Sequence, residues 1–193
     1  MDKNKISVCI ATYNGEKYIK EQINSILPQL KNCDEIIISD DHSSDKTLDV
    51  IFQINDSRIQ VYLNDKEKGY TSNFENALSK ATGSIIFLAD QDDIWKSNKV
   101  EVLQKSLEDS DLVVSDAEVV NGDLDVISPS FFVLGNKYTS FWGNIFKFAY
   151  LGCCMCFKRK VLEKALPFPK QHKLCTHDNW LFMVASAFYT TKI

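Results

Sequence analysis

The stretch Ser84–Trp95, SIIFLADQDDIW, constrains this chain more than any other. Residues Ile85–Ala89 are uniformly apolar or small, which is the length and pattern of a strand buried on both faces. The run continues directly into three carboxylates, those of Asp90, Asp92 and Asp93. Because ligands of open α/β sheets bind at the carboxyl edge of the strands, these side chains are expected at a binding site.

The chemistry of this acidic turn favours a metal ion. Three like charges in a short turn repel one another unless a cation lies among them or solvent screens them. Carboxylate oxygens are ligands that suit Mg²⁺ or Mn²⁺. The D-x-D spacing alone has little specificity, because it occurs three times in the chain, and the pairs that begin at Asp109 and Asp123 fit a helix end and a turn. We predict a metal-assisted site for a phosphorylated ligand, with a solvated turn as the alternative.

The first half of the chain alternates between strand and helix patterns. Strands are expected over 5–11, 35–39, 58–63 and 85–89, and helices over 16–27, 46–55, 71–81 and 97–107. This alternation predicts an α/β fold with a mostly parallel, Rossmann-like sheet and helices on both faces. A dinucleotide-binding fold and a P-loop are both disfavoured, because neither glycine-rich pattern is present.

The regular alternation of strand and helix patterns ends in the second half of the chain. Strands are expected over 112–115, 117–120 and 152–158, an aromatic irregular segment over 128–150, and a helix over 176–188. The aromatic segment is interpreted as core, with acceptor stacking or contact with a membrane surface as alternatives. The chain is 45% hydrophobic and 25% charged, an ordinary composition for one core, so we expect residues 1–193 to form a single domain.

Bulk properties exclude several classes of protein. A net charge of −4 gives no basic field for nucleic acid. The sequence shows neither a signal-peptide pattern nor an apolar stretch of membrane-spanning length, so a cytoplasmic protein is expected. The six cysteines are therefore read as reduced thiols. Three of them form C-C-x-C at 153–156, which is not the usual zinc-binding spacing, and they are not predicted to bind metal.

Several motifs together resemble inverting family 2 glycosyltransferases of the GT-A fold. Their first strand and loop are similar to ISVCIATYNG, their second-strand motif to IIISDDHSSDKT, and their D-x-D strand to FLADQDDIW. The D-Q-D-D-x-W form, with GYTSNFENAL upstream, resembles bacterial rhamnosyltransferase-type members that build surface polysaccharide. GCCMCFKR and THDNWL fit the acceptor-side strand and helix of that group. The resemblance implies a nucleotide-sugar-binding half over 1–110 and an acceptor-side half over 111–193, C-terminally truncated.

The resemblance implies a nucleotide site at the ends of the first strands. Thr12 and Tyr13 would line the base, with Tyr13 stacking on it. Asp40 would hydrogen-bond the uracil or thymine edge, and Asp90 would face the ribose or the metal. The structural alternatives are that Tyr13 is a turn aromatic and that Asp40 only ends its strand, where the following turn favours such residues regardless of ligand.

The resemblance also implies the reactive groups. Asp92 would ligate Mn²⁺ or Mg²⁺ on the diphosphate, Asp93 would orient the loop or touch the donor sugar, and Asp178 would be the general base. The alternative for Asp178 is a first-turn acid that stabilises its helix. Many family members have Glu where His177 stands, so His177 is expected either to support the carboxylate or bind acceptor, or to be a solvated first-turn residue.

The implied function is transfer of a sugar, with inversion, from a UDP- or dTDP-linked donor to a hydroxyl of a glycan or lipid-linked acceptor in bacterial surface polysaccharide synthesis. A peripheral location at the inner face of the plasma membrane is implied by the same resemblance. Family members usually continue past the last helix, so one alternative is a truncated, non-catalytic nucleotide-binding relative. A sugar-nucleotide nucleotidyltransferase is a weaker alternative, since it needs a glycine-rich loop where this chain has only Gly15.

Overall fold

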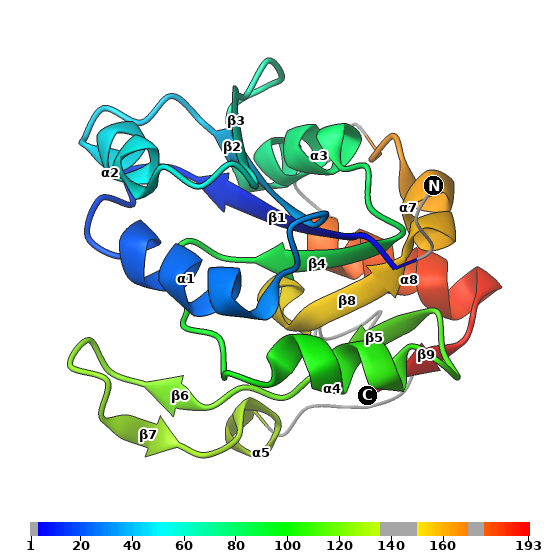
Figure 1. The fold of residues 1–193 in the computed structure, drawn as a ribbon. Helices are drawn as coiled ribbons and strands as arrows, with labels where there is room; N and C mark the ends of the chain where they lie inside the picture. Colours follow the sequence, from blue (N-terminus) through cyan, green and yellow to red (C-terminus); the bar gives the residue numbers. More distant parts are fainter. Residues whose placement is uncertain (1–3, 136–149, 170–175) are drawn as a thin grey trace.

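A computed structural model describes residues 4–135, 150–169 and 176–193. Within these residues the main sheet has seven strands in the order β3-β2-β1-β4-β8-β5-β9 (Figure 1). The strands are β1 (Ile6–Thr12), β2 (Glu35–Asp40), β3 (Ile59–Leu63), β4 (Ile85–Ala89), β5 (Leu112–Val114), β8 (Met155–Lys158) and β9 (Thr191–Lys192). Strands β1 to β4 are mutually parallel, β9 runs parallel to β5, and β8 runs antiparallel to both of its neighbours. The predicted mostly parallel sheet is confirmed.

Helices cover both faces of the sheet, as predicted (Figure 1). They are α1 (Ile19–Ile26), α2 (Thr47–Ile54), α3 (Tyr70–Lys80), α4 (Lys99–Ser106), α5 (Phe131–Gly135), α7 (Arg159–Ala165) and α8 (His177–Phe188), with 3-10 turns η1 (Leu27–Gln29) and η2 (Gly152–Cys154). None of these helices is long and apolar enough to cross a bilayer.

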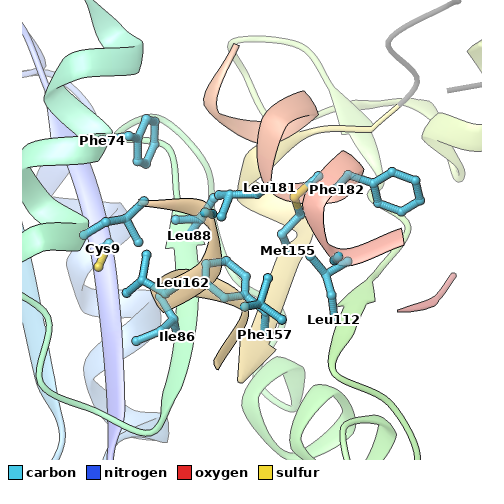
Figure 2. Close-up of a cluster of buried hydrophobic side chains, with 14 of the residues drawn as sticks. Cys9, Phe74, Ile86, Leu88, Leu112, Met155, Phe157, Leu162, Leu181 and Phe182 are labelled. Carbon is cyan, nitrogen blue, oxygen red and sulfur yellow. The ribbon is translucent and has the colours of Figure 1, made fainter. Parts of the chain in front are cut away.

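The alternation of side chains along each buried strand builds two cores. In β4, Ile86 and Leu88 join a cluster with α3, α7 and α8 (Figure 2), whereas Phe87 and Ala89 join a second cluster with α1, α2 and α4. All four side chains are fully buried. A strand that contributes to both cores must be apolar throughout, which explains the uniform run before Asp90.

The second half differs from the predictions in several places. The strand expected over 152–158 begins only at Met155, because Gly152–Cys154 form η2. The strand expected over 117–120 is shorter, and Val119–Val120 (β6) pair with Val126–Ser128 (β7) in a separate hairpin. Helix α7 and strand β9 were not predicted. Of the aromatic segment, Tyr150 is buried against Phe182 at a ring separation of 4.5 Å, and the expectations for 136–149 lie outside the described residues.

The parallel strands bring the predicted site to one edge. Residue Thr12 is paired with Asp40 across β1 and β2, and Ile10 with Ala89 across β1 and β4. The loops that follow β1, β2 and β4 therefore leave the sheet side by side. Helix α3 is fixed above this edge, where Asn73 donates a hydrogen bond to the Thr12 carbonyl at 3.0 Å.

Candidate active site

A pocket of about 550 Å³ opens at the carboxyl edge of β1 and β4, beneath the first turns of α3. Its lining is Ala11, Thr12, Tyr13, Asp41, Lys68, Gly69, Tyr70, Asn73, Phe74, Asp90, Gln91 and Asp92. Four of the seven predicted site residues, Thr12, Tyr13, Asp90 and Asp92, therefore line one cavity. The other three predicted residues, Asp40, Asp93 and Asp178, lie outside this lining.

Gln91 holds the loops after β1 and β4 together. Its Oε1 accepts a hydrogen bond from the Tyr13 amide at 3.0 Å, and its Nε2 donates one to the Tyr13 carbonyl at 3.1 Å. A side chain at Gly15 would meet the Gln91 amide, which would have to move and release the Tyr13 backbone. The Tyr13 backbone is held by both of these hydrogen bonds while the residue stays 54% exposed, which leaves its ring available for stacking.

The two aspartates after β2 have different environments. Asp40 is fully buried and accepts hydrogen bonds from the Ser43 amide, the Ser43 hydroxyl and the Thr12 hydroxyl, each at 2.7 Å. Asp41 lines the pocket and accepts hydrogen bonds from Asn64 Nδ2 at 2.8 Å and from the Gly69 amide at 2.9 Å. Consecutive residues at a strand end point to opposite faces, so only one of the two reaches the pocket.

The acidic turn after β4 is partly buried, and this changes its ionisation. The pKa of Asp90 is raised to about 6, mainly by burial and then by the negative charges of Asp93, Asp92 and Asp178. A hydrogen bond from Cys153 acts in the opposite direction and lowers this pKa. Burial also raises the pKa of Asp93, opposed by Cys153 and by the ammonium of Lys99. One oxygen of each carboxylate and the Cys153 sulfur lie within 4.8 Å of one another. Asp92 is exposed and, like Asp90, lines the pocket.

Lys99 of α4 contacts η2 of the second half of the chain beside the acidic turn. Its Nζ donates a hydrogen bond to the Cys153 carbonyl at 2.8 Å and lies 4.6 Å from the centre of the Trp95 ring. The side chain is half-buried. The positive charge is held beneath the acidic turn, where it favours the ionised form of Asp93.

The first turn of α8 presents Asp178 toward the same turn. Asp178 is partly exposed, and its Oδ1 accepts hydrogen bonds from the Thr176 hydroxyl and from the Asn179 amide, the latter at 2.8 Å. The charge of Asp178 contributes to the raised pKa of Asp90. The predicted donor-side and acceptor-side carboxylates therefore lie close enough to interact electrostatically.

His177 is not solvated, which contradicts one of the alternatives considered for it. It is 5% exposed, stacks on Phe74 with ring centres 4.0 Å apart, and meets Tyr70 edge-on at 6.0 Å. Burial lowers its pKa to about 4, so the imidazole is neutral at pH 7. Within the described part of the chain, neither ring nitrogen has a hydrogen-bond partner. A side chain at Gly152 would lie 2.6 Å from His177 Nε2, so this packing requires glycine.

Sequence reasoning missed Gln91, Lys68, Asp41, Cys153 and Lys99. Gln91 and Asp41 stood beside predicted residues in the motifs, so their position was a usable signal. Lys68 lies in the loop before α3 and lines the pocket, but an exposed lysine in a loop carries no signal in sequence. Lys99 opens α4 six residues after Asp93, but its contact with Cys153 is not visible in the sequence. Cys153 reaches the acidic turn only through the antiparallel placement of β8, which local patterns do not reveal.

A cleft at the carboxyl edge of a parallel sheet, with an acidic turn on one side and a helix-borne carboxylate on the other, is an arrangement typical of nucleotide-dependent transferases. The profile described as Glycosyl transferase family 2 matches residues 7–166. The chain belongs to this family.

Among curated proteins, UDP-Glc:alpha-D-GlcNAc-diphosphoundecaprenol beta-1,3-glucosyltransferase WfgD of Escherichia coli is 30% identical over 177 residues, covering 90% of this chain and 67% of that protein. A second Escherichia coli glucosyltransferase with the same stated donor and acceptor, WfaP, is 40% identical over 95 residues, covering 49% of this chain and 38% of that protein. The chain spans 53% and 45% of the lengths of two other relatives.

Solved structures share the fold. TarS 1-349 of S. aureus in complex with UDP-GlcNAc superposes with a TM-score of 0.76 at 23% identity, covering 98% of this chain and 56% of that chain. Glucosyl-3-phosphoglycerate synthase from Mycobacterium tuberculosis, in complex with Mn²⁺, UDP and phosphoglyceric acid, superposes with a TM-score of 0.69 at 22% identity, covering 98% of this chain and 67% of that chain. The GT-A fold expected from the motifs is confirmed.

Proposed function

We propose that this protein transfers a hexosyl group, with inversion, from a UDP-sugar to a hydroxyl of a lipid-linked glycan acceptor in surface polysaccharide synthesis. The observation that carries the proposal is the single pocket lined by Tyr13, Asp41, Asp90 and Asp92, with Asp178 close enough to interact with Asp90. The relatives named above use UDP-glucose by name, which favours a glucosyl over a rhamnosyl donor.

The nucleotide base is proposed to stack on the exposed ring of Tyr13. Asp41 takes the place of Asp40 as the group that faces the base, because Asp41 lines the pocket, whereas Asp40 is fully buried outside the lining and accepts three hydrogen bonds from the chain. Thr12 lines the pocket while its hydroxyl holds Asp40 in place. Lys68 adds a positive charge to the lining, which suits a diphosphate.

The acidic turn has a donor set that fits a divalent cation. Asp92 is exposed to the pocket and Asp90 is beside it, so both offer carboxylate oxygens on the side where a diphosphate would lie. A bound Mn²⁺ or Mg²⁺ would neutralise negative charge on the leaving diphosphate, an effect of several kcal/mol. Asp93 lies outside the pocket lining and is proposed to shape this turn.

Asp178 is proposed as the general base. Its Oδ1 is oriented by Thr176 and Asn179, and no hydrogen bond from the described residues reaches Oδ2. Oδ2 is therefore the atom that takes the proton from the acceptor hydroxyl while that oxygen attacks the sugar. Closure of the pocket by acceptor would exclude water and strengthen these interactions.

The first test is calorimetric titration of UDP, dTDP and GDP, with and without Mn²⁺. We expect UDP to bind in a metal-dependent manner and Asp92→Ala to abolish that dependence. Failure of a folded protein to bind any of the three nucleotides would contradict the proposal.

Two further measurements separate the proposed function from its alternatives. Release of UDP from UDP-glucose in the presence of a diphosphoprenol-linked acceptor supports a transferase, whereas nucleotide binding without any turnover supports the non-catalytic alternative. Sedimentation with liposomes that carry the acceptor tests peripheral association with the inner membrane face. A protein that stays in the supernatant would contradict that location.

A further inference from the structure

Tyr70 is an exposed aromatic side chain that lines the pocket from the side of α3. It is the first residue of this helix and is 61% exposed. The preceding Gly69 has a φ of 132° and donates a hydrogen bond from its amide to Asp41 Oδ2 at 2.9 Å. Because a residue with a side chain is strained at such a φ, glycine is needed to start α3 at this point. The backbone that carries Tyr70 is therefore fixed to the floor of the pocket.

Two buried rings support Tyr70 from the side of α8. His177 meets the Tyr70 ring edge-on, with ring centres 6.0 Å apart and an interplanar angle of 74°. The other side of this support is Phe74, which stacks on His177 at 4.0 Å. Edge-to-face and stacked pairs at these separations are favourable arrangements of aromatic rings. Asp178 directly follows His177, so Tyr70 lies on the side of the pocket that is nearest to the proposed general base.

We propose that the ring of Tyr70 is the platform on which the terminal sugar of the acceptor stacks. This inference rests on the proposed function, because it gives a position to the acceptor of that reaction. One face of a pyranose ring presents C–H groups, which are attracted to the electron-rich face of an aromatic ring. Stacking would also fix the orientation of the sugar and bring one of its hydroxyls to Asp178. Tyr70 would be a specificity-determining residue and would take no part in proton transfer.

Among the described residues, the pocket lining contains two tyrosines with different neighbours. Tyr13 follows β1, and its backbone is held by Gln91 of the acidic turn. Tyr70 instead packs against α8, the helix that carries Asp178. This arrangement places one exposed ring on the donor side of the cavity and the other on the acceptor side. Two alternatives for Tyr70 are a solvated surface side chain and a second stacking partner of the nucleotide base.

Saturation-transfer-difference NMR tests the contact without turnover. The probe is N-acetylglucosaminyl diphosphate with a short alkyl chain, which carries the sugar and diphosphate that the acceptors of the named relatives contain. Spectra are recorded with and without UDP and Mg²⁺. We expect saturation of the sugar ring protons in the wild type and in Tyr70→Phe, and its loss in Tyr70→Ala. The matched control is Tyr18→Ala, because Tyr18 is 51% exposed and lies outside the pocket lining.

Two outcomes of this experiment would overturn the inference. One is saturation that survives in Tyr70→Ala, and the other is the absence of saturation in a wild-type protein that binds UDP. Tyr70→Leu, which keeps apolar bulk without an aromatic ring, is the second variant if Tyr70→Ala fails to fold. It should lose the saturation as well.

Kinetics with the same acceptor distinguish this inference from the proposed function. Tyr70→Ala should raise the KM for the acceptor about 10-fold, whereas kcat and the Kd for UDP stay within about twofold of the wild type. An unchanged KM would leave Tyr70 a solvated side chain. A raised Kd for UDP would assign Tyr70 to the nucleotide base, and either result would overturn the inference. Failure of the proposed function is recorded separately, as a wild-type protein that binds no nucleotide.

Discussion

The turns after β2 and β4 begin with the same kind of sequence, a buried strand followed by aspartates, yet they use those aspartates differently. Asp40 and Asp41 together accept five hydrogen bonds from the chain, which fix the surrounding loops. Asp90 and Asp93 are instead held in a partly buried place with raised pKa values beside a thiol.

The difference teaches that a carboxylate at a strand end is not by itself a reactive group. Hydrogen bonds from the chain favour the ionised form of a carboxylate and occupy its lone pairs, so such an acid builds the site. Burial without enough donors disfavours the ionised form, and a cation would relieve this cost. Asp40 is therefore mainly structural, whereas Asp90 and Asp92 after β4 are mainly chemical. Substitutions at the β2 turn should therefore affect mainly stability, and substitutions at the β4 turn should affect mainly activity.

The largest expected effect lies at the acid that faces the β4 turn from α8. Asp178→Asn should lower kcat by roughly 10²–10⁴, because an amide cannot take the acceptor proton. UDP affinity should stay unchanged, since Asp178 lies outside the pocket lining. Steady-state kinetics and calorimetry measure both quantities, with exposed Asp109→Asn as the control. A variant with normal turnover would assign Asp178 to helix stabilisation.

The next effect is on folding and tests the β2 turn. Asp40→Ala removes a fully buried carboxylate and leaves the Ser43 amide and the Thr12 hydroxyl without their acceptor. We expect a loss of about 3 kcal/mol in the free energy of unfolding, measured in urea. The matched variant Asp92→Ala, at an exposed position, should change it by less than about 0.5 kcal/mol. Equal losses at both positions would remove the distinction between the two turns.

The sequence was sufficient for the parts of the fold that depend on local pattern. Short uniform apolar runs rich in β-branched residues and bounded by turn residues, such as Ile36–Ile38 and Ile85–Ala89, favour strands buried between two helical layers, so the first half was predicted closely. The direction of β8 was not predictable, since an apolar run packs equally well in either direction. Helix α7 was missed because it is short and follows β8 without a loop.

The sequence identified many of the residues of the candidate site but not how their side chains are arranged. The acidic turn was identified because its apolar strand is unmistakable. The choice between Asp40 and Asp41 depends on which of two adjacent side chains faces α3, and adjacency in sequence does not decide this. Cys153 was excluded as a ligand on its spacing to other cysteines, although its neighbours in space are aspartates.

The next prediction concerns His177, which stacks on Phe74 of the pocket lining. Burial lowers its folded pKa to about 4 from an ordinary value of 6.5. As pH falls from 6.5 toward 4, the His177 imidazole is protonated in the unfolded chain but stays neutral in the folded chain, so the folded state loses stability. His177→Phe keeps the stacking on Phe74 and lacks this loss. We measure the free energy of unfolding of the variant and the wild type in urea at pH 5 and at pH 8. The difference in favour of the variant should be about 2 kcal/mol larger at pH 5 than at pH 8. A difference that does not change with pH would mean that burial leaves the pKa of His177 at its ordinary value.

The smallest effect is the pH dependence of the β4 turn, and it has the opposite sign. The folded pKa of Asp90, about 6, lies above its ordinary value of 3.8, so the unfolded chain ionises first as pH rises. Stability attributable to Asp90 is therefore present below about pH 4, is lost between pH 4 and 6, and stays lost above that.

Asp90→Asn lacks this loss. The full pKa shift would be worth about 2 kcal/mol between pH 4 and pH 7. Because Asp90 is partly exposed, solvent screening reduces this, and the stability of the variant relative to the wild type should rise by about 1 kcal/mol with metal chelated. Asp109→Asn is the control, because it changes an exposed acid outside the site. A flat difference for Asp90→Asn would show that the β4 turn ionises as readily as an exposed acid. In that case a cation would relieve no unfavourable charge there, and the contrast with the β2 turn would rest on hydrogen bonds alone.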